Sequence, residues 1–327
     1  MIDLMLFEML LSKLSNIFDK DKDINVLMLG HSGVGKTTIL ASLYNEFAKN
    51  MFDKSISLKA DDETRKKLNE QLVDLKEGLQ ADKFIFVPKL KGTTGITNYK
   101  FYLEDNDGNK IVNLNFIDIR GGDVVDNQSK ITNKIKAANI ILVPIDATAM
   151  IEKDERNKNY HDRINQPDEI RNILSEIIKT DAEKMVIFSP VKSESYFDNL
   201  FQLERIFERK YRDILRLFQN KSNILVSYIP IKTIGDIKFI EIQKNNDNPI
   251  FVFAPSKFEA SYNPEYVEQI FILILLFTFA QKYKTLRFFQ RAVKKDIESI
   301  YKEYKKELKE NIIKYQHNSH LLDLKRD

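Results

Sequence analysis

Nine consecutive residues could hold a phosphate group: Gly30-His31-Ser32-Gly33-Val34-Gly35-Lys36-Thr37-Thr38. They fit the pattern G-x-x-x-x-G-K-[ST] without a substitution. The glycines let successive backbone N–H groups turn toward one anion, a geometry that residues with a Cβ resist. Lys36 adds a mobile positive charge, Thr37 offers a hydroxyl to Mg²⁺, and a helix beginning here points the positive end of its dipole at the phosphates. The spacing predicts a site for a nucleoside triphosphate and its magnesium.

The flanks of this stretch supply the elements that must position it. Ile24–Leu29 is an apolar run typical of a buried strand, and Thr38–Lys49 has the periodicity of a helix. Strand, loop and helix therefore follow in the order that a phosphate site needs. The alternative, a glycine-rich turn that binds nothing, is disfavoured by this context.

A second candidate site, Asp118-Ile119-Arg120-Gly121, follows the apolar strand Leu114–Ile117. That strand belongs to a predicted hairpin of Thr97–Leu103 and Lys110–Ile117. A carboxylate at the tip of such a strand can hold Mg²⁺ through water, and the N–H of Gly121 can approach the γ-phosphate. The D-x-x-G pattern is common, so its weight comes from its place after a phosphate loop.

A third candidate site could contact a base. The apolar strand Met185–Phe188 leads into Ser189-Pro190-Val191-Lys192-Ser193-Glu194. The aliphatic stem of Lys192 can cover the face of a base, and the Glu194 carboxylate can accept from the N1–H and N2–H₂ groups of guanine, which adenine lacks. Pro230–Gly235 follows another strand and is placed to touch the base, because ligands bind at the carboxyl ends of parallel strands. A solvated Lys/Glu turn is the alternative.

Composition limits the class of protein. The 327-residue chain is long enough for one large domain with additions or for two small domains. It has no cysteine, which excludes disulfides and thiol chemistry, and its net charge of +3 is not that of a dedicated nucleic-acid binder, so no specific nucleic acid is expected as a partner. The N-terminus lacks a basic n-region, and the longest uncharged apolar run, Ile270–Ala280, is too short to span a bilayer. These features favour a cytoplasmic protein.

Helical periodicity predicts further helices outside the candidate sites. They are Ile2–Phe18, Asp61–Lys83, Ile170–Ile178, Tyr196–Phe218, a helix from Pro264 that carries the apolar run Ile270–Ala280, and Leu286–Ile312. We expect the first to pack on the nucleotide domain or on a partner. The helix at Ile270–Ala280 is apolar on every side and should be buried. The last helix is amphipathic and has an excess of Lys and Arg, so it should expose a basic face.

Two more patterns complete the expected fold. Ile237–Ile242 and Pro249–Ala254 have the pattern of a second hairpin, which we expect to extend the edge of the sheet, and Ile151–Asp168 is expected to be a surface loop. Together the elements predict an α/β three-layer sandwich with a mostly parallel sheet and one antiparallel edge. The expected domains are an N-terminal helix and linker over residues 1–23, a nucleotide domain over 24–284 with a helical insert near 61–90, and a basic amphipathic helix over 285–327.

The chain resembles TRAFAC-class, Ras-like GTPases across roughly Asn25–Ala280. The resemblance rests on the order of four motifs, at Gly30–Thr37, Thr94, Asp118–Gly121 and Lys192/Glu194. More narrowly, the chain is similar to prokaryotic double-GTPase-type proteins of bacterial signalling and conflict systems. The resemblance implies a P-loop domain in which Lys36 contacts the β- and γ-phosphates, Thr37 ligates Mg²⁺ and Asp118 supports the metal through water. It also implies that Thr94 closes a first switch onto the metal and the γ-phosphate. Thr94 keeps the family's spacing to Tyr99.

Two positions depart from the family's pattern. Gly122 stands where the family often has a Gln that orients the attacking water, so hydrolysis lacks its usual agent. Arg120 and Asp123 are the local candidates to compensate. The base motif N/T-K-x-D reads Val191-Lys192-Ser193-Glu194, which loses the first polar residue and replaces Asp by Glu. These changes weaken the prediction of guanine specificity.

The motifs predict a GTP-binding switch that uses Mg²⁺ and hydrolyses GTP to GDP slowly. Such a switch would control an effector protein through its switch loops, at Thr94 and Gly121–Gln128, through the insert at 61–90, or through the terminal helices. One alternative is a nucleotide-dependent scaffold that assembles with partners or with itself as a homodimer. Another is a GTPase held peripherally at the inner face of the membrane by Ile2–Phe18 and the basic C-terminal helix.

Overall fold

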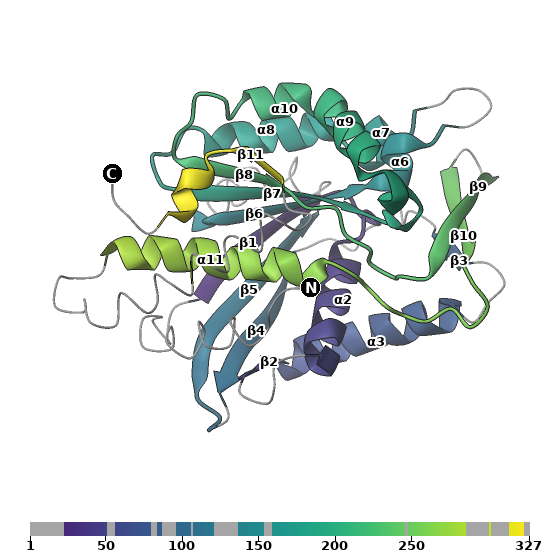
Figure 1. Ribbon diagram of the computed structural model, residues 1–327, viewed down its shortest axis with the longest axis horizontal. Coiled ribbons are helices and arrows are strands. Elements are labelled where there is room, and N and C mark those ends of the chain that lie inside the picture. The colour runs from purple at the N-terminus through teal and green to yellow at the C-terminus, as the bar shows by residue number, and fades with distance from the viewer. Residues whose placement is uncertain are drawn as a thin grey trace.

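The computed structural model describes residues 23–50, 56–79, 84–86, 96–105, 107–120, 137–153, 159–245, 248–285, 301 and 314–323. Figure 1 shows a central sheet with helices on both faces and a small second sheet beside it. This architecture confirms the predicted α/β three-layer sandwich.

Eight strands of the described chain form the central sheet, in the order β11-β8-β7-β6-β1-β5-β4-β2. Its parallel part consists of β1 (Asp23–Gly30), β5 (Lys110–Arg120), β6 (Ile140–Asp146), β7 (Lys184–Val191) and β8 (Ile224–Tyr228). β4 (Thr97–Asp105) runs antiparallel to β5, so the first predicted hairpin is confirmed. Parallel strands end at one edge of a sheet, so the C-terminal ends of β1, β5, β6 and β7 lie together there.

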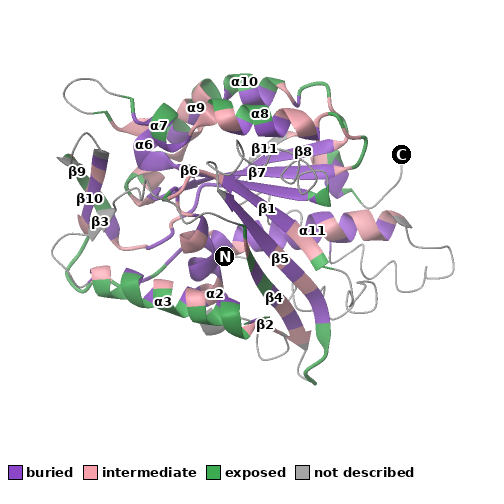
Figure 2. Cartoon of the chain, turned by 180° about the vertical axis from the view of Figure 1, so that it is seen from behind, coloured by how far each residue is buried: buried purple, intermediate pink, exposed green. Residues whose placement is uncertain are grey.

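The parallel strands are buried on both faces, as near-continuous apolar runs require. Val26 and Met28 of β1 join the core on one face, and Leu27 and Leu29 join the core on the other. The first core lies under α2 (Lys36–Asn50), α3 (Asp62–Leu79) and α11 (Val267–Thr285). The second lies under α8 (Pro167–Ile177), α9 (Leu200–Lys210) and α10 (Arg212–Arg216). Figure 2 shows the strands buried between these layers, exposed residues on α3, α8, α9 and α10, and only buried or intermediate residues on α2 and α11.

The helix α11 is the buried apolar helix that the sequence predicts. Every residue from Ile270 to Phe277 is buried, and the Phe271 ring meets Phe47 of α2 edge-on with 4.5 Å between the ring centroids. α11 thus joins the core beside the helix that follows the phosphate loop. None of the helices in the described ranges combines the length and the hydropathy that a membrane crossing needs.

The two edge strands of the central sheet were not among the predicted elements. β2 (Ile56–Ala60) pairs antiparallel with β4, and β11 (Lys314–His317) pairs antiparallel with β8. β11 and the 3₁₀ helix η3 (Ser319–Leu322) correct the prediction that residues 285–327 form a helix to their end. The helix predicted over Leu286–Ile312 lies outside the described residues apart from Tyr301. The pairing gives β8, which would otherwise end the sheet, a partner for its backbone groups.

The second predicted hairpin forms, but the prediction of its position is wrong. β9 (Ile237–Asn245) and β10 (Asn248–Pro255) pair antiparallel as expected. β10 then pairs with β3 (Phe84–Phe86), and the three strands make a separate sheet. The insert supplies this partner strand, and Phe251 and Phe253 of β10 are fully buried. In Figure 1 the small sheet stands beside the edge of the central sheet at which the parallel strands end.

The helix predicted over Asp61–Lys83 forms as α3, which buries Leu68, Leu72, Leu75 and Leu79. The single helix predicted over Tyr196–Phe218 is wrong, because the segment is divided into η1 (Glu194–Asn199), α9 and α10. Asn199 starts α9 by accepting a hydrogen bond from the backbone N–H of Gln202, and the buried Tyr211 separates α9 from α10 with φ −101° and ψ 11°. Packing of Tyr211 in the core thus overrides the local periodicity.

The surface loop predicted over Ile151–Asp168 is also corrected. It begins at the end of α6 (Ala147–Ile151) and contains the short helix α7 (His161–Ile164). His161 and Asn165 are buried in it, although both are polar. Their hydrogen bonds, described below, are the reason that polar residues can be buried here. The N-terminal helix predicted at Ile2–Phe18 lies outside the described residues.

Candidate nucleotide-binding site

The loop after β1 has the backbone that an anion cradle needs. Gly33 and Gly35 have φ values of +82° and +117°, in the left-handed region that residues with a Cβ resist. A Cβ added to Gly35 would lie 3.1 Å from Cγ2 of Val191, so the loop also packs closely on the base motif. Val34 is buried beneath the loop, and its N–H donates to the His31 carbonyl at 3.4 Å. The backbone therefore makes a tight turn at this loop.

The helix α2 begins at Lys36, so its N-terminus faces the loop. The Lys36 side chain is only 5% exposed. Its Nζ donates to the Gly30 carbonyl, lies 3.2 Å from the His31 carbonyl oxygen and lies 3.4 Å from Oδ1 of Asp118. The ammonium is thus held at the helix N-terminus, where the helix dipole favours an anion. The neighbouring residues Ser32, Thr37 and Thr38 are half-buried.

Asp118 lies on β5, the strand next to β1, and its register partner on β1 is Met28. The sequence places Asp118 at the tip of the strand, but β5 continues past it to Arg120. Asp118 is nevertheless buried at 7% exposure and close to Lys36. The structure therefore brings the carboxylate of the second motif to the lysine of the first.

Several predicted site residues cannot be placed. Thr94, Gly121 and Gly122 lie outside the described residues, and for Arg120 the structure describes the backbone at the end of β5 but not the side chain. The switch loops at Thr94 and at Gly121–Gln128 thus stay predictions.

The base motif follows β7 and reaches back to the phosphate loop. Lys192 has φ +54°, an uncommon conformation for a residue with a side chain, and such strain is concentrated at functional sites. Its Nζ lies 3.4 Å from the Gly33 carbonyl oxygen and 2.5 Å from Oδ2 of Asp146. Val191, where the family's pattern has a polar residue, is fully buried against Gly35. An apolar contact therefore joins the two loops at that position.

Glu194 contacts the loop after β8 with one carboxylate oxygen. Oε1 accepts from the backbone N–H of Ile234 at 2.8 Å and from that of Gly235 at 3.4 Å. Oε2 is buried, and among the described residues it has no hydrogen-bond partner. Burial raises the pKa of the Glu194 carboxyl above its ordinary value, against the backbone N–H groups that lower it. One acceptor oxygen at the base motif is thus left without a donor among the described residues.

The loop after β8 is held by the segment that leads into α11. Lys232 and Glu265 exchange backbone hydrogen bonds of 3.1 and 3.0 Å, and the Asn263 N–H donates to the Ile234 carbonyl at 3.0 Å. Gly235 has φ +102°, and a Cβ there would lie 2.3 Å from the Asn263 carbonyl oxygen. Only glycine therefore fits this close approach.

A buried hydroxyl connects the same loop to α2. Oγ of Ser42 lies 2.7 Å from the carbonyl oxygen of Thr38, 2.7 Å from that of Thr233 and 2.9 Å from the hydroxyl of Tyr262. The helix that follows the phosphate loop is thus tied to the loop that flanks the base motif.

Sequence reasoning missed two residues of this site, Asp146 and Asn165. The Asn165 side chain accepts from the Asp146 N–H at 2.8 Å and donates to the Asp146 carbonyl at 3.1 Å. It also lies 3.0 Å from Nδ1 of His161, which must accept because an amide nitrogen only donates. Burial, followed by the charge of Lys210, lowers the pKa of His161 to about 3, so the ring is neutral at pH 7. A carboxylate that closes the apolar strand Ile140–Ile145 was the available signal for Asp146.

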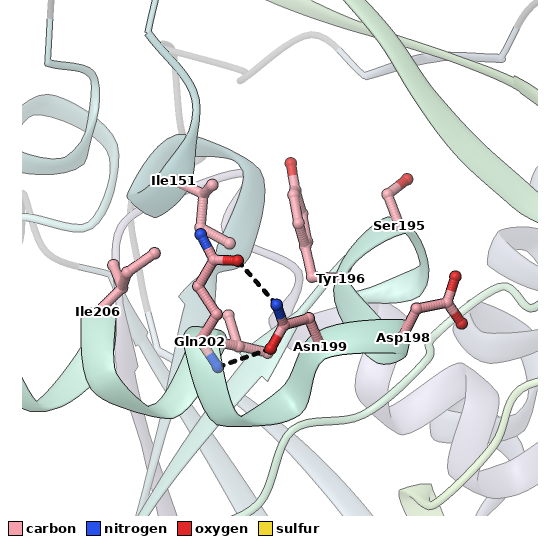
Figure 3. Close-up of a pocket in the computed structure, with 8 residues that line it drawn as sticks. Ile151, Ser195, Tyr196, Asp198, Asn199, Gln202 and Ile206 are labelled. Carbon is pink, nitrogen blue, oxygen red and sulfur yellow. Dashed lines mark hydrogen bonds between the residues drawn. The ribbon is translucent and has the colours of Figure 1, made fainter.

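A separate cavity of about 140 Å³ lies behind the base motif, between α6, η1 and α9. Figure 3 shows Asn199 hydrogen-bonded to Gln202 at its floor, with Ile151 and Ile206 beside it and Tyr196 rising from η1. This volume is below the several hundred Å³ of typical ligand pockets. The cavity is therefore too small for a nucleotide, and the candidate site remains the edge of the sheet where β1, β5, β6 and β7 end.

The sheet order, the glycine-rich loop before α2 and the lysine and carboxylates gathered beside it define a P-loop GTPase of the Ras-like type. The sequence matches the Double-GTPase 2 family, DO-GTPase2, over residues 24–226, which is more than half of the chain. The chain belongs to this family. Membership makes it a guanine-nucleotide-binding protein of the GTPase-switch class.

Comparison with solved structures gives a match to an ADP-ribosylation factor-like GTP-binding protein, the small COPII coat GTPase SAR1 from Encephalitozoon cuniculi, in complex with GDP. The two chains are 10% identical, the match covers 70% of this chain and 77% of that one, and the TM-score is 0.33. Comparison with curated proteins gives no match.

Proposed function

We propose that this chain is a switch that binds GTP and GDP with Mg²⁺, hydrolyses GTP slowly and controls a partner protein. One observation carries the proposal: Lys36 at the start of α2 and Asp118 near the end of β5 lie close together beside the glycine-rich loop. Nζ of Lys36 lies 3.4 Å from Oδ1 of Asp118, and Nζ of Lys192 lies 3.4 Å from the Gly33 carbonyl oxygen. Phosphate-binding and base-binding groups thus share one edge of the sheet.

In this proposal, the phosphates lie in the loop Gly30–Thr37 at the N-terminus of α2. Lys36 leaves its contacts with the loop carbonyls to pair with the β- and γ-phosphates, which are stronger acceptors. The backbone N–H groups of His31 to Thr38 cradle the same oxygens. The backbone N–H of Gly121 contacts the γ-phosphate from the second motif, and Thr94 closes over it.

The residues beside the loop fit Mg²⁺. Thr37 offers a hydroxyl and Asp118 a buried carboxylate, and both are the hard oxygen ligands that Mg²⁺ takes together with substrate phosphates. When bound, Mg²⁺ neutralises charge on the phosphates. In this proposal Thr37 ligates the metal, Asp118 holds it through water, and Thr94 adds a ligand in the triphosphate state.

The base motif selects guanine in this proposal. The stem of Lys192, stretched toward the phosphate loop, covers one face of the base. The buried Oε2 of Glu194 accepts from the N1–H and N2–H₂ groups of guanine, while Oε1 stays with the Ile234 N–H. Adenine has a lone pair at N1 and no amino group at C2, so it would leave this oxygen without a donor.

Slow hydrolysis follows from the residue at the water-positioning place, which is Gly122. A GTPase without this group or an arginine finger is slower by about 10³- to 10⁵-fold. Arg120 and Asp123 are the local candidates to compensate. A partner protein would supply what is missing, and the proposed contact surface is formed by the switch loops, the insert at 61–90 and the terminal helices. We propose that this chain is cytoplasmic and controls its partner in a bacterial signalling or conflict system.

The proposal is tested by nucleotide binding and phosphate release with Lys36→Ala and with Lys66→Ala, an exposed control on α3. We expect Lys36→Ala to lower GDP and GTP affinity by about 100-fold or more, because it removes a charge-assisted contact at a buried site. The intrinsic turnover of the wild type should be on the order of 10⁻⁴–10⁻² s⁻¹. Wild-type affinity in Lys36→Ala, or no GTP hydrolysis by the wild type, would contradict the proposal.

A further inference from the structure

We propose that Asp146 is the positioning residue for Lys192, and that Asn165 fixes Asp146 in turn. This inference rests on the proposed function, because it concerns the lysine assigned there to the base. Neither residue belongs to the motifs that define the phosphate or the base site. Their role is read from three observations: the place of Asp146 in the sheet, the saturation of its polar groups, and the backbone of Lys192.

Asp146 lies between the two loops that the nucleotide would join. It is the last residue of β6, which is hydrogen-bonded to β1 on one side and to β7 on the other. Its register partner on β7 is Val191, the residue before Lys192. The phosphate loop follows β1, so Asp146 stands at the end of the strand that separates the phosphate loop from the base motif.

Every polar group of Asp146 has a partner. Oδ1 accepts from the Ala149 N–H at 2.9 Å, which caps α6, and Oδ2 lies 2.5 Å from Nζ of Lys192. The main-chain N–H and carbonyl both bond to the Asn165 side chain, at 2.8 and 3.1 Å. The carboxylate is fully buried. Asp146 can therefore hold a charge in one orientation without leaving another group unsatisfied.

The pair fixes a side chain that would otherwise be mobile. Lysine has a flexible four-carbon stem, and its ammonium is a point charge that needs an anchor. Lys192 is 4% exposed in this pair, its Nζ also lies 3.4 Å from the Gly33 carbonyl oxygen, and its φ of +54° directs the side chain from a strained backbone. With Nζ held at the far end, the stem is stretched between the base motif and the phosphate loop. Lys192 is therefore held in one orientation, in which we propose that its stem meets the face of a base.

The stem contacts the plane of the base, which guanine and hypoxanthine share, so the loss of Asp146 should weaken GDP and IDP by the same factor. That equality separates this role from a contact with the edge of the base. Positioning through Lys192 differs from a merely structural role because its effect requires Lys192. In a double-mutant cycle, Asp146→Asn should therefore add nothing once Lys192→Met has removed the ammonium.

The experiment compares the wild type, Asp146→Asn, Lys192→Met and the double variant, with Asp213→Asn as an exposed control on α10. GDP and IDP affinities are measured with Mg²⁺, together with thermal unfolding without nucleotide. Asp146→Asn should weaken both nucleotides by about 10- to 100-fold, and the double variant should bind within about twofold of Lys192→Met. Wild-type affinity in Asp146→Asn, or a double variant more than about fivefold weaker than Lys192→Met, would overturn the inference.

Asp146→Asn leaves the buried ammonium of Lys192 without its carboxylate, so this variant could fail to fold. A second variant avoids this problem. Asn165→Ala keeps both charges and removes the two hydrogen bonds to the Asp146 main chain. It should weaken GDP by about 3- to 10-fold, and unchanged affinity in this folded variant would overturn the inference as well. A wild type that fails to bind GDP would refute the proposed function itself. A wild type that binds, with unaffected variants, would refute only the role of Asp146.

Discussion

Replacing Glu194 by glutamine should change which base the protein prefers. In the structure, Oε1 of Glu194 accepts from the Ile234 N–H at 2.8 Å, and Oε2 is buried. Glutamine is nearly isosteric, so its carbonyl oxygen can keep the bond to Ile234 while its NH₂ group takes the place of Oε2. Glu194→Gln thus puts a donor where the proposed site has an acceptor, with the loop after β8 left in place.

The size of the effect follows from the groups that would meet. Guanine presents two donors, N1–H and N2–H₂, and the amide nitrogen of the variant cannot accept from either. A hydrogen bond to a charged group contributes about 1.5–3 kcal/mol, and a buried donor left unsatisfied costs about 1–3 kcal/mol. The sum of about 2.5–6 kcal/mol corresponds to a loss of GDP affinity of about 10²- to 10⁴-fold. Xanthine has a carbonyl at C2, so it can accept from the new NH₂ group, and XDP should bind the variant better than GDP.

The assay is competition of GDP, XDP and ADP against one fluorescent nucleotide, at neutral pH with Mg²⁺. Glu208→Gln, an exposed glutamate on α9, is the matched control. Because Glu194 also holds Ile234, loss of structure would weaken all three nucleotides equally, so the ratio of XDP to GDP affinity isolates the base contact. An unchanged ratio in Glu194→Gln would refute the assignment of Oε2 to guanine.

Three further predictions concern pH dependence and stability. Burial raises the pKa of Glu194, and only the ionised carboxylate presents two acceptor oxygens. GDP affinity should therefore fall as the pH is lowered through that raised pKa. The same pH profile in Glu194→Gln would contradict this prediction. Gly235→Ala should unfold more easily than Gly108→Ala, because both glycines have positive φ but only the Cβ at position 235 meets backbone, 2.3 Å from the Asn263 carbonyl oxygen. Equal losses in thermal unfolding, of about 1–2 kcal/mol each from the left-handed backbone alone, would refute the clash. Burial first, and then nearby carboxylates, raise the pKa of Glu268 from 4.5 to about 7. Between these pH values the folded state binds a proton that the unfolded state has lost. The free energy of unfolding should therefore fall as the pH rises from 4.5 to about 7, by up to about 3 kcal/mol. Urea unfolding of Glu268→Gln should show a flatter profile over that window, and an unchanged slope would count against the raised pKa.

The parts of the fold that the sequence predicts well depend on local chemistry. The loop Gly30–Thr37 needs glycines, a lysine and a following helix, all within one short stretch, and the hairpin of β4 and β5 needs alternation around a turn. The buried helix α11 is apolar on every face. In each case, neighbouring residues carry the whole signal.

The parts of the fold that the sequence does not predict depend on contacts between residues that are distant in the sequence. The alternation of β9 and β10 predicts a hairpin but cannot indicate that β10 will pair with Phe84–Phe86 of the insert. Likewise, the break at Tyr211 comes from its burial against Phe207 and Phe188. Choice of partner is a property of the folded core, and periodicity does not encode it.

The candidate site follows the same rule. Asp146 has no motif of its own, because its partner Lys192 is 46 residues away in the sequence. Glu194 has a local motif, but its bond to Ile234 spans 40 residues and assigns one oxygen to the loop after β8. Sequence reasoning could name the residues that we propose touch a nucleotide, whereas the residues that position them needed the structure.

A calorimetric titration of the wild-type chain with GDP, GTP and ATP in the presence of Mg²⁺ tests most directly whether the loop Gly30–Thr37 and the base motif bind a guanine nucleotide. We predict saturable one-to-one binding of GDP and GTP, and ATP affinity at least about 100-fold weaker, because adenine offers no donor pair to Glu194. Equal affinity for ATP would contradict the role of Glu194. The absence of binding heat and of competition with either guanine nucleotide would contradict the site as a whole.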